Sequence, residues 1–247
     1  MKEYIAKGGS DPYIIKTAIS TLSEYKRVNI DLGVAEEKLF EIPFLDAYIG
    51  ECLNVGVDLK SKEELFYDCG STFTKICENR HSVRLYDTKS EKISEQEILE
   101  GISIAQNCPS ACNRQAVRVK VITKPNMIKE ICEIQGGARG FGENSGALLI
   151  ITSDISLYEP AERRIPMLDC GIFIMNLIYS LYEKRIGTCV LNGSFNLERE
   201  KRMREVVPIP ANEMYAAIIS LSKIPDGESI KVARSIKRDV RDIVDIL

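Results

Sequence analysis

Two stretches of the chain decide which fold we expect: Glu78-Asn79-Arg80-His81-Ser82-Val83-Arg84 and, further along, Cys108-Pro109-Ser110-Ala111-Cys112-Asn113-Arg114-Gln115. In an extended segment alternate side chains share one side, so Arg80, Ser82 and Arg84 would project together. Two guanidinium groups and a hydroxyl suit a phosphate with a polyol tail, because arginine presents a rigid fork of donors to phosphate oxygens. Taken alone, this first stretch is better explained as a basic loop that leads into the next element.

The second stretch follows an amphipathic helical pattern, which Pro109 breaks. Its small and amide-bearing residues predict a tight loop where a planar ring can approach the backbone. Ser110, Asn113 and Gln115 offer donors and acceptors to the polar edge of such a ring. A phosphate site followed by a site for a planar, polar ring indicates a flavin.

In this order, the two stretches resemble the R-R-S-x-R and P-S-x-x-N-x-Q signatures of the FMN-dependent nitroreductase family. A third match is Asp169-Cys170-Gly171, an apolar helix and then Gly187-Thr188-Cys189-Val190-Leu191-Asn192-Gly193, similar to the family's D-x-G, long helix and G-x-G-T-x-x-x-x-G region. The resemblance extends from about Glu78 to the C-terminus. It implies an α+β fold, with a mixed sheet flanked by helices, that binds FMN.

The resemblance also implies that the chemistry takes place on the flavin, with no catalytic acid or base from the protein. FMN would take a hydride from NADH or NADPH, and a nitroaromatic compound, a quinone or another small electrophile would then be reduced by two electrons in the same space. Two alternatives stay open. One is a flavin-dependent oxidase or biosynthetic modifying enzyme of the same fold that does not use NAD(P)H, and the other is a non-enzymatic member.

Position by position, the resemblance implies a set of FMN-binding residues. They are Arg80, His81, Ser82 and Arg84 for the phosphate and ribityl chain; Pro109, Ser110, Ala111 and Asn113 beside the isoalloxazine ring, with Asn113 and Gln115 hydrogen-bonding the ring or the ribityl chain; and Leu191, Asn192 and Gly193 for the N5 edge. Similar family members place a Lys or Arg near the C-terminus on the FMN phosphate, so Arg238 is our first candidate there and Lys237 the second. The basic stripe that contains them is otherwise typical of a solvated helix face.

The stretch Gly136-Gly137-Ala138-Arg139-Gly140-Phe141-Gly142 is rich in glycine but does not match a phosphate-binding loop. It lacks the following Lys-Ser or Lys-Thr pair, and it precedes a predicted strand. We predict a flexible loop near the active site whose Arg139 and Phe141 contact substrate, and a plain connecting turn is the alternative.

The chain divides into a small helical extension, residues 1–75, and an FMN-binding domain, residues 76–247. In the extension, Asp11-Pro12 predicts the start of a helix through residue 22, and a second apolar run spans residues 35–53. The nitroreductase resemblance does not cover this part. In the main domain, the capping box Ser94-x-x-Glu97 predicts a helix, and strands are expected at 118–122, 147–152 and 214–221.

Residues 165–182 are apolar on nearly every side, with Pro166 placed to start a helix and Gly187 to stop it. Asp169 and Asn176 interrupt a run that is already short for a bilayer, so we predict a buried central helix and no membrane span. In the family, the corresponding helix lies at the centre of a dimer interface with FMN between the subunits. The resemblance therefore implies a homodimer with FMN at the subunit interface.

Composition narrows the remaining function classes. A net charge of −3 and a pI near 5.5 argue against a nucleic-acid surface. The N-terminus lacks the apolar core of a signal peptide, which favours a cytoplasmic protein. Of the 8 cysteines, Cys108-x-x-x-Cys112 has no matching second pair, and His81 is the only histidine, so we predict no metal site. Most of the thiols are expected to be small buried apolar groups.

The sequence also departs from the family pattern. Ala116-Val117 follows Gln115 where the family usually continues Pro-Trp, Asn192 stands where many members have Glu, and Ser222-Lys223 replaces a Gly-aromatic pair. These departures affect the expected substrate more than they affect the expected binding of the flavin.

Overall fold

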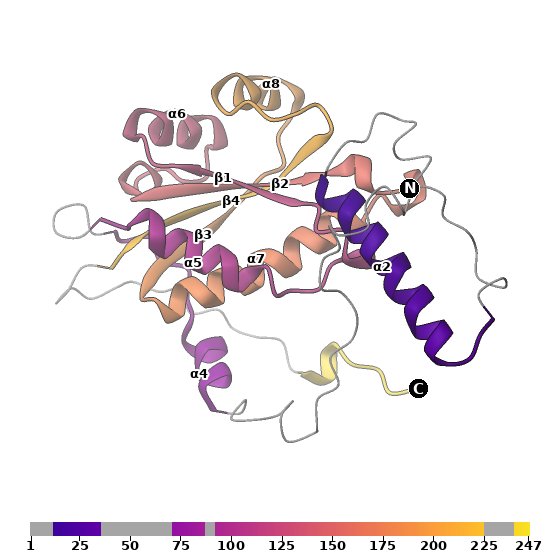
Figure 1. Cartoon of the computed structure of the whole chain (residues 1–247). Coiled ribbons are helices and arrows are strands. Elements are labelled where there is room, and N and C mark those ends of the chain that lie inside the picture. Colours follow the sequence, from indigo (N-terminus) through magenta and orange to yellow (C-terminus); the bar gives the residue numbers. More distant parts are fainter. Residues whose placement is uncertain (1–11, 36–70, 87–91, 225–239) are drawn as a thin grey trace. The chain divides into compact units, whose positions relative to one another are not determined.

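The structure of the chain is a computed structural model, and it describes residues 12–35, 71–86, 92–224 and 240–247 (Figure 1). The chain divides into two compact units, Met1–Asp68 and Cys69–Leu247, and each is described by itself. The boundary expected near residue 75 stays a prediction. The second apolar run beyond residue 35 lies outside the described residues, as do Lys237 and Arg238.

In the first unit, helix α2 (Pro12–Asp31) agrees with the helix expected after Asp11 and continues beyond residue 22. Arg27 lies one turn from Glu24 and one turn from Asp31, and its guanidinium contacts each carboxylate at 2.7 Å. Such pairs at three- and four-residue spacing support a helix. They explain how α2 extends into polar sequence.

The second unit contains an antiparallel sheet, and helices cover both of its faces. The strands of the described part, in spatial order, are β1 (Val117–Ile122), β2 (Ala147–Asp154), β4 (Glu213–Lys223) and β3 (Ile186–Asn192). The three expected strands correspond to β1, β2 and β4, whereas the sequence prediction does not include β3. An isolated parallel bridge joins Ser82 to Thr188 of β3. The predicted α+β class is confirmed.

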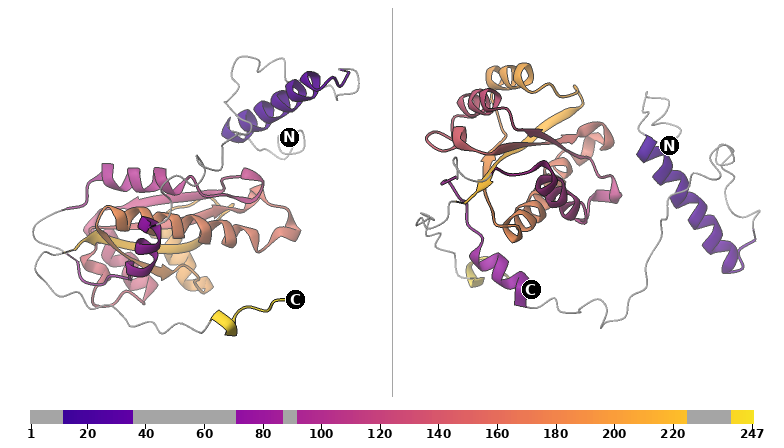
Figure 2. Two further views of the ribbon diagram at one scale, coloured as in Figure 1. Left: turned by 90° about the horizontal axis from the view of Figure 1, so that it is seen from below. Right: turned by 60° about the vertical axis from the view of Figure 1, so that its left-hand side comes forward.

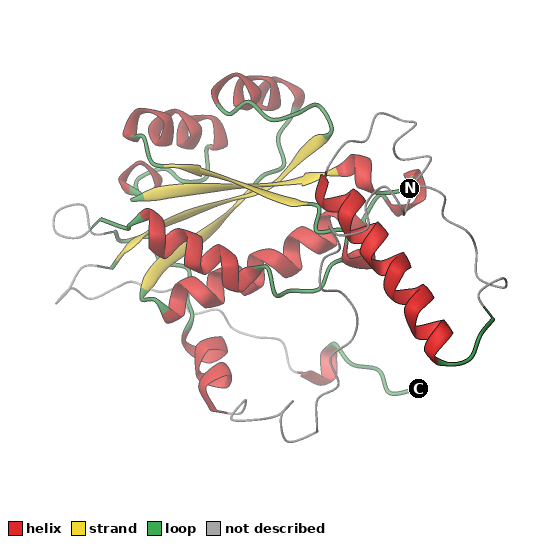
Figure 3. Cartoon of the chain, in the orientation of Figure 1, coloured by secondary structure: helices red, strands yellow, loops and turns green. Residues whose placement is uncertain are grey.

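In the described part of the chain, two helices pack on each face of the sheet (Figures 1 and 2). Helices α5 (Glu95–Ala105) and α7 (Ile165–Glu183) cover one face, and α6 (Pro125–Gln135) and α8 (Leu197–Val206) cover the other. Figure 3 shows the two layers of helices around the strands. A short helix, α4 (Ser71–Asn79), contacts α7.

Strand β2 lies in the interior because both of its faces are covered. Leu149 and Ile151 pack in the cluster beneath α5 and α7, while Leu148 and Ile150 pack in the cluster beneath α6 and α8. A strand buried on both faces is expected to be a continuous apolar run. The run at 147–151 is therefore apolar at every position.

Helix α7 begins as expected, with Pro166 in its first turn, but it does not end at Gly187. The helix ends at Glu183, and Arg185 with φ of 59° makes the turn into β3. Gly187 lies inside β3, where a Cβ atom would approach Val83 Cγ1 to 2.9 Å. The assignment of Gly187 as the helix stop was wrong. This glycine instead leaves room for Val83, which packs against β3 at this point.

By length and apolar composition alone, α7 could cross a membrane. In the structure it packs on β1, β2 and β3 and buries Phe173, Leu177 and Leu181 against the sheet. These contacts are those of a helix in the core of a folded domain.

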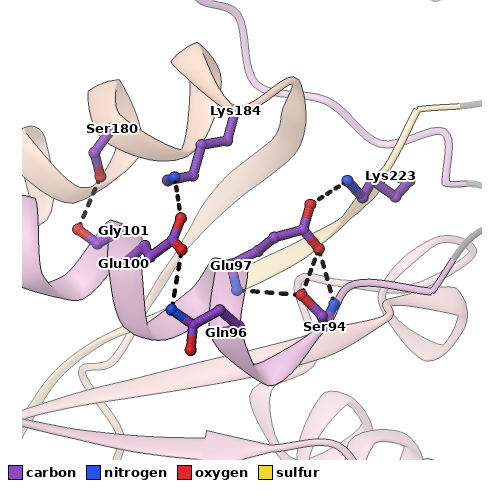
Figure 4. A network of polar contacts seen from close by, with 8 residues as sticks. All are labelled: Ser94, Gln96, Glu97, Glu100, Gly101, Ser180, Lys184 and Lys223. Atoms are coloured by element: carbon purple, nitrogen blue, oxygen red, sulfur yellow. Dashed lines mark hydrogen bonds and ion pairs between the residues drawn. The ribbon is translucent and has the colours of Figure 1, made fainter.

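A polar network fastens α5 to α7 and β4 (Figure 4). The capping box is present as predicted: Glu97 N donates to Ser94 Oγ at 3.2 Å, and Ser94 N donates to Glu97 Oε2 at 2.9 Å. Glu97 also pairs with Lys223 of β4, and Ser180 Oγ donates to the Gly101 carbonyl at 2.9 Å. The network fixes the helix that leads into the loop at Pro109.

We expect Glu97→Gln to destabilise the protein by about 1 kcal/mol at pH 7, because it weakens both the cap and the pair with Lys223. The Lys223 ammonium, helped by the Ser94 donors, lowers the pKa of Glu97 from 4.5 to about 2. A depressed carboxyl pKa stabilises the fold above the unfolded pKa, and this stability is lost as the pH falls from about 4.5 towards 2.

The measurement is urea unfolding of the wild type and Glu97→Gln between pH 7 and pH 2.5, with Glu95→Gln as the control in the same helical turn. The difference between the wild type and Glu97→Gln should shrink as the pH falls. A difference that stays constant over this range would contradict the assigned ionic contribution.

Candidate functional site

The Arg80 segment, residues 80–84, lies extended beside β3. Val83 N donates to the Thr188 carbonyl at 2.9 Å, and Ser82 forms the parallel bridge with the same residue. Val83 is buried, whereas His81 and Arg84 are exposed and Arg80 and Ser82 are half-buried. The apolar Val83 is turned into the protein, but exposure along the segment does not follow the strict alternation that we predicted.

Arg80 carries a buried polar atom with no hydrogen-bond partner among the described residues. This atom is the guanidinium Nε. A buried donor without an acceptor is costly, and native proteins seldom contain one unless a ligand or water completes it. The Arg80 segment thus presents an unsatisfied donor beside β3.

Arg84 lies between a thiol and an aromatic ring. Its guanidinium stands 5.8 Å from the centroid of the Phe141 ring, and it interacts with Cys189 on β3. Burial raises the pKa of the Cys189 thiol, and the positive charge of Arg84 acts in the opposite direction. The contact with Phe141 brings one of the two predicted substrate residues next to the Arg80 segment.

The loop that carries Phe141 contains local backbone hydrogen bonds, and its predicted flexibility stays a prediction. Gly136 ends α6 in the left-handed region with φ of 78°, and Gly142 N donates to the Ala138 carbonyl at 2.8 Å. Phe141 packs near Tyr86 with ring centroids 6.2 Å apart, while Arg139 is exposed. A contact with substrate stays a prediction for both residues.

Tyr86 is a residue of this region that the sequence reasoning missed. It is buried, and its hydroxyl lies 2.6 Å from Ser220 Oγ. The alternation that selected Arg80, Ser82 and Arg84 continues to Tyr86. That pattern could have identified it.

The Pro109 loop, residues 108–115, has an unusual backbone. Cys112, Asn113 and Gln115 have φ of 51°, 54° and 49°, the left-handed region that residues other than glycine rarely occupy. Gln115 N donates to Ser110 Oγ at 3.1 Å, and Gln115 Nε2 donates to Asn113 Oδ1 at 3.0 Å. Such strained backbone is concentrated at functional sites in proteins.

Strand β3 ends in the third motif, at Leu191, Asn192 and Gly193. Leu191 is buried, while Asn192 is exposed and its Oδ1 accepts from Ser194 N at 2.8 Å. A Cβ atom on Gly193 would lie 2.6 Å from the Ala216 carbonyl carbon. Only glycine fits where the chain crosses β4 this closely.

Two of the three motifs lie together at β3, and the third is connected to α7. The Arg80 segment and Leu191–Gly193 share β3. The Pro109 loop is joined to the start of α7, since Ala111 N donates to both carboxylate oxygens of Asp169 at 3.1 and 3.2 Å. Asp169 was part of the matched motif, but the sequence reasoning gave it no role.

Thiols and metal ligands complete the description of this unit. Within residues 71–86 and 92–224, Cys132, Cys170 and Cys189 are buried, Cys108 is half-buried, and Cys77 and Cys112 are exposed, all as free thiols. In the described ranges, no three His, Cys, Asp or Glu side chains gather where a metal ion could bind.

Comparison with known proteins supports the resemblance to the nitroreductase family. The model of the nitroreductase family matches residues 77–138, which contain both the Arg80 segment and the Pro109 loop. The resemblance to the nitroreductase family is confirmed. A curated relative with nitroreductase in its name, the putative NADH dehydrogenase/NAD(P)H nitroreductase of Archaeoglobus fulgidus, is 28% identical over 151 residues, which cover 60% of this chain and 82% of the relative.

Solved structures of nitroreductase-like proteins share the fold. A putative NAD(P)H:FMN oxidoreductase of Staphylococcus epidermidis superposes with a TM-score of 0.61 at 20% identity and covers 72% of this chain and 96% of its own. An FMN-dependent nitroreductase of Clostridium difficile gives 0.59 at 16% identity, with 70% and 98% covered. At such identities the likeness establishes the fold alone.

Proposed function

We propose that the chain is an FMN-dependent oxidoreductase that uses NADH or NADPH to reduce a nitroaromatic compound, a quinone or another small electrophile by two electrons. The observation that carries the proposal is the buried Nε of Arg80, which has no hydrogen-bond partner among the described residues and lies in a segment that also carries Ser82 and Arg84. Such a donor set matches the phosphate and ribityl groups of FMN. The names of the relatives, which include NAD(P)H nitroreductase and FMN-dependent nitroreductase, support the same reading.

We assign the described residues to the separate chemical parts of a flavin. Arg80, Ser82 and Arg84 would hold the phosphate and ribityl chain, and the ordered side chains of Asn113 and Gln115 would meet polar atoms of the ring. The backbone at Leu191–Gly193 would lie at the N5 edge, where Gly193 permits close packing. When bound, FMN supplies the hydride chemistry, and the protein supplies binding and orientation.

The residues around this site have separate tasks in the proposed reaction. Arg84 would offset the negative charge of the phosphate that it helps to hold, and donors on the pyrimidine side of the ring would stabilise negative charge on the reduced cofactor. Phe141 and Tyr86 would exclude water from one side, because both rings pack against the region of Arg84. No side chain is needed as a proton donor in the hydride step.

We also propose that the active protein is a homodimer. Three large apolar side chains of α7 remain exposed in the single chain: Met167 at 40%, Leu168 at 56% and Met175 at 38%. Exposed apolar side chains that gather on one helix commonly mark a protein interface. A second copy would cover them, and it would also explain why the Pro109 loop is fastened to α7 while the other two motifs share β3.

The proposal is tested by anaerobic reduction of the purified protein. We expect FMN to co-purify or to bind on addition, giving flavin absorption bands that NADH or NADPH bleaches and that a quinone or nitroaromatic compound restores. Bands that no nicotinamide bleaches would favour a flavin-dependent oxidase or modifying enzyme. A protein that binds no FMN would overturn the proposal in favour of a non-enzymatic member.

A further inference from the structure

We propose that four residues, Arg114, Tyr158, Glu162 and Asp169, form a clamp that holds the Pro109 loop in the shape that receives the flavin ring. They are positioning residues, because they act on the loop and not on the reacting atoms. The inference rests on the proposed function for its ligand. Its geometry comes from contacts that link three separate parts of the chain.

Asp169 is the centre of the clamp. It is only 3% exposed, and its carboxylate accepts the Ala111 N–H through both oxygens. The Tyr158 hydroxyl donates to Asp169 Oδ2 at 2.8 Å. A buried carboxylate is tolerated only when donors compensate for its lost hydration, so these two donors and Asp169 depend on each other.

Arg114 connects the loop to the segment before α7. Its Nη1 donates to Glu162 Oε2 at 2.8 Å, and its guanidinium stands 5.1 Å from the centroid of the Tyr158 ring. Glu162 Oε2 also accepts from Glu159 N at 2.8 Å, which fixes the carboxylate in its own turn. Tyr158 therefore contacts both halves of the clamp, Asp169 through its hydroxyl and Arg114 through its ring.

The charges of the clamp favour its closed arrangement. The Glu159 backbone donor and the Arg114 guanidinium lower the pKa of Glu162, so this carboxylate is ionised near neutral pH. Burial, followed by the hydrogen bond to Asp169, raises the pKa of Tyr158, so its hydroxyl keeps the proton that it donates. Both polar contacts of the clamp therefore persist at neutral pH.

The loop has a physical need for such support. Its left-handed residues Cys112, Asn113 and Gln115 are each less stable than they would be in an ordinary turn. Strained backbone persists only where the surroundings determine it, and the clamp holds Ala111 and Arg114, at both sides of Cys112 and Asn113. Opening the clamp would let these residues relax and would move Ser110 and Asn113 away from the ring.

The test compares Asp169→Asn and Tyr158→Phe with the wild type. Asp169→Asn keeps the shape of the side chain but replaces the carboxylate that accepts both hydrogen bonds with a neutral amide. We expect the FMN Kd to rise about tenfold. Tyr158→Phe removes one donor, and we expect a rise of about threefold. The double variant should be no weaker than Asp169→Asn, because the hydroxyl acts through the carboxylate.

The matched control is Tyr215→Phe. Tyr215 is buried on the opposite face of the sheet and donates one hydrogen bond to the Val207 carbonyl at 2.9 Å. The Tyr215→Phe substitution should lower the melting temperature about as much as Tyr158→Phe does. It should leave the FMN Kd and the visible spectrum of the bound flavin unchanged. Any difference between the two tyrosines then reports on the loop and not on general stability.

A second readout needs no flavin. In the FMN-free protein, amide hydrogen exchange at Ala111 should accelerate in Asp169→Asn and stay slow in Tyr215→Phe. Variants that melt at lower temperature but bind FMN with wild-type affinity and spectrum would overturn the clamp and leave the proposed function intact. A wild-type protein that binds no FMN would overturn the proposed function, and with it the purpose that we assign to the clamp.

Discussion

Gly171→Arg is expected to convert the proposed homodimer into a folded monomer that no longer retains FMN. Gly171 is exposed within α7, and a Cβ atom placed there would meet no neighbouring atom within 4 Å outside the nearby helix backbone. A glycine inside a helix costs about 0.5–1 kcal/mol relative to alanine. The described residues of the single chain therefore provide no structural reason for glycine at this position.

A partner helix would provide that reason. Gly171 lies one turn from Met167 and Leu168 and one turn from Met175, so all four share the exposed stripe of α7. A glycine at the centre of an apolar stripe allows another helix to approach closely, and an arginine there would place a charge between the two helices. The substitution would prevent pairing without disturbing the interior of one subunit.

Light scattering measures the subunit state, and dialysis followed by absorption spectroscopy measures the retained FMN. Glu133→Arg, on the exposed surface of α6, is the control for added charge and should remain dimeric. Gly171→Ala adds a second test, because it should stabilise an isolated chain but weaken a dimer. If Gly171→Arg stays dimeric with its flavin bound, α7 is not the interface.

The parts of the fold that could be predicted are those with strong local signals. The capping box at Ser94 fixes the start of α5, and the near-continuous apolar runs of β2 and β4 follow from burial on both faces. Helix α8 was missed because seven of its ten residues are charged and only Met203 is buried. Its cap was visible, however, since the Asn196 side chain accepts from Arg199 N at 2.9 Å.

Other elements were missed because one residue suggested a different role. Pro125 and Gly136 mark the two ends of α6, but Gly136 was considered only as part of a glycine-rich loop. Gly187 was taken as a helix stop, although its reason is the close approach of Val83 across β3. The role of a glycine depends on its neighbours in space, which the local sequence does not contain.

In the candidate site, too, residues close together along the chain could be predicted, whereas contacts between distant residues could not. The motif residues could be found by resemblance because they are close together along the chain. The clamp could not, because Ala111 and Asp169 are 58 residues apart and Arg114 and Glu162 are 48 apart. Contacts of this kind depend on how α7 and the Pro109 loop pack, and no periodicity along the chain reports that packing.

Arg80→Ala should weaken FMN binding strongly and leave the FMN-free protein at least as stable as the wild type. A charge-assisted hydrogen bond to a phosphate contributes about 1.5–3 kcal/mol, so the FMN Kd should rise by about 10- to 150-fold. Without a ligand, the buried Nε of Arg80 has no partner among the described residues, so the substitution removes a costly unsatisfied donor. The opposite signs of the two effects distinguish a ligand-binding arginine from a structural one.

The measurements are the FMN Kd and the melting temperature of the wild type and Arg80→Ala, each with and without FMN. Arg80→Lys keeps the charge but loses the guanidinium fork and should fall between the two, while Arg202→Ala, exposed on α8, is the control and should match the wild type. FMN should raise the melting temperature of the wild type and raise that of Arg80→Ala much less. Arg80 would have to be assigned to the fold, and removed from the phosphate site, if Arg80→Ala melted lower without FMN and bound FMN with wild-type affinity.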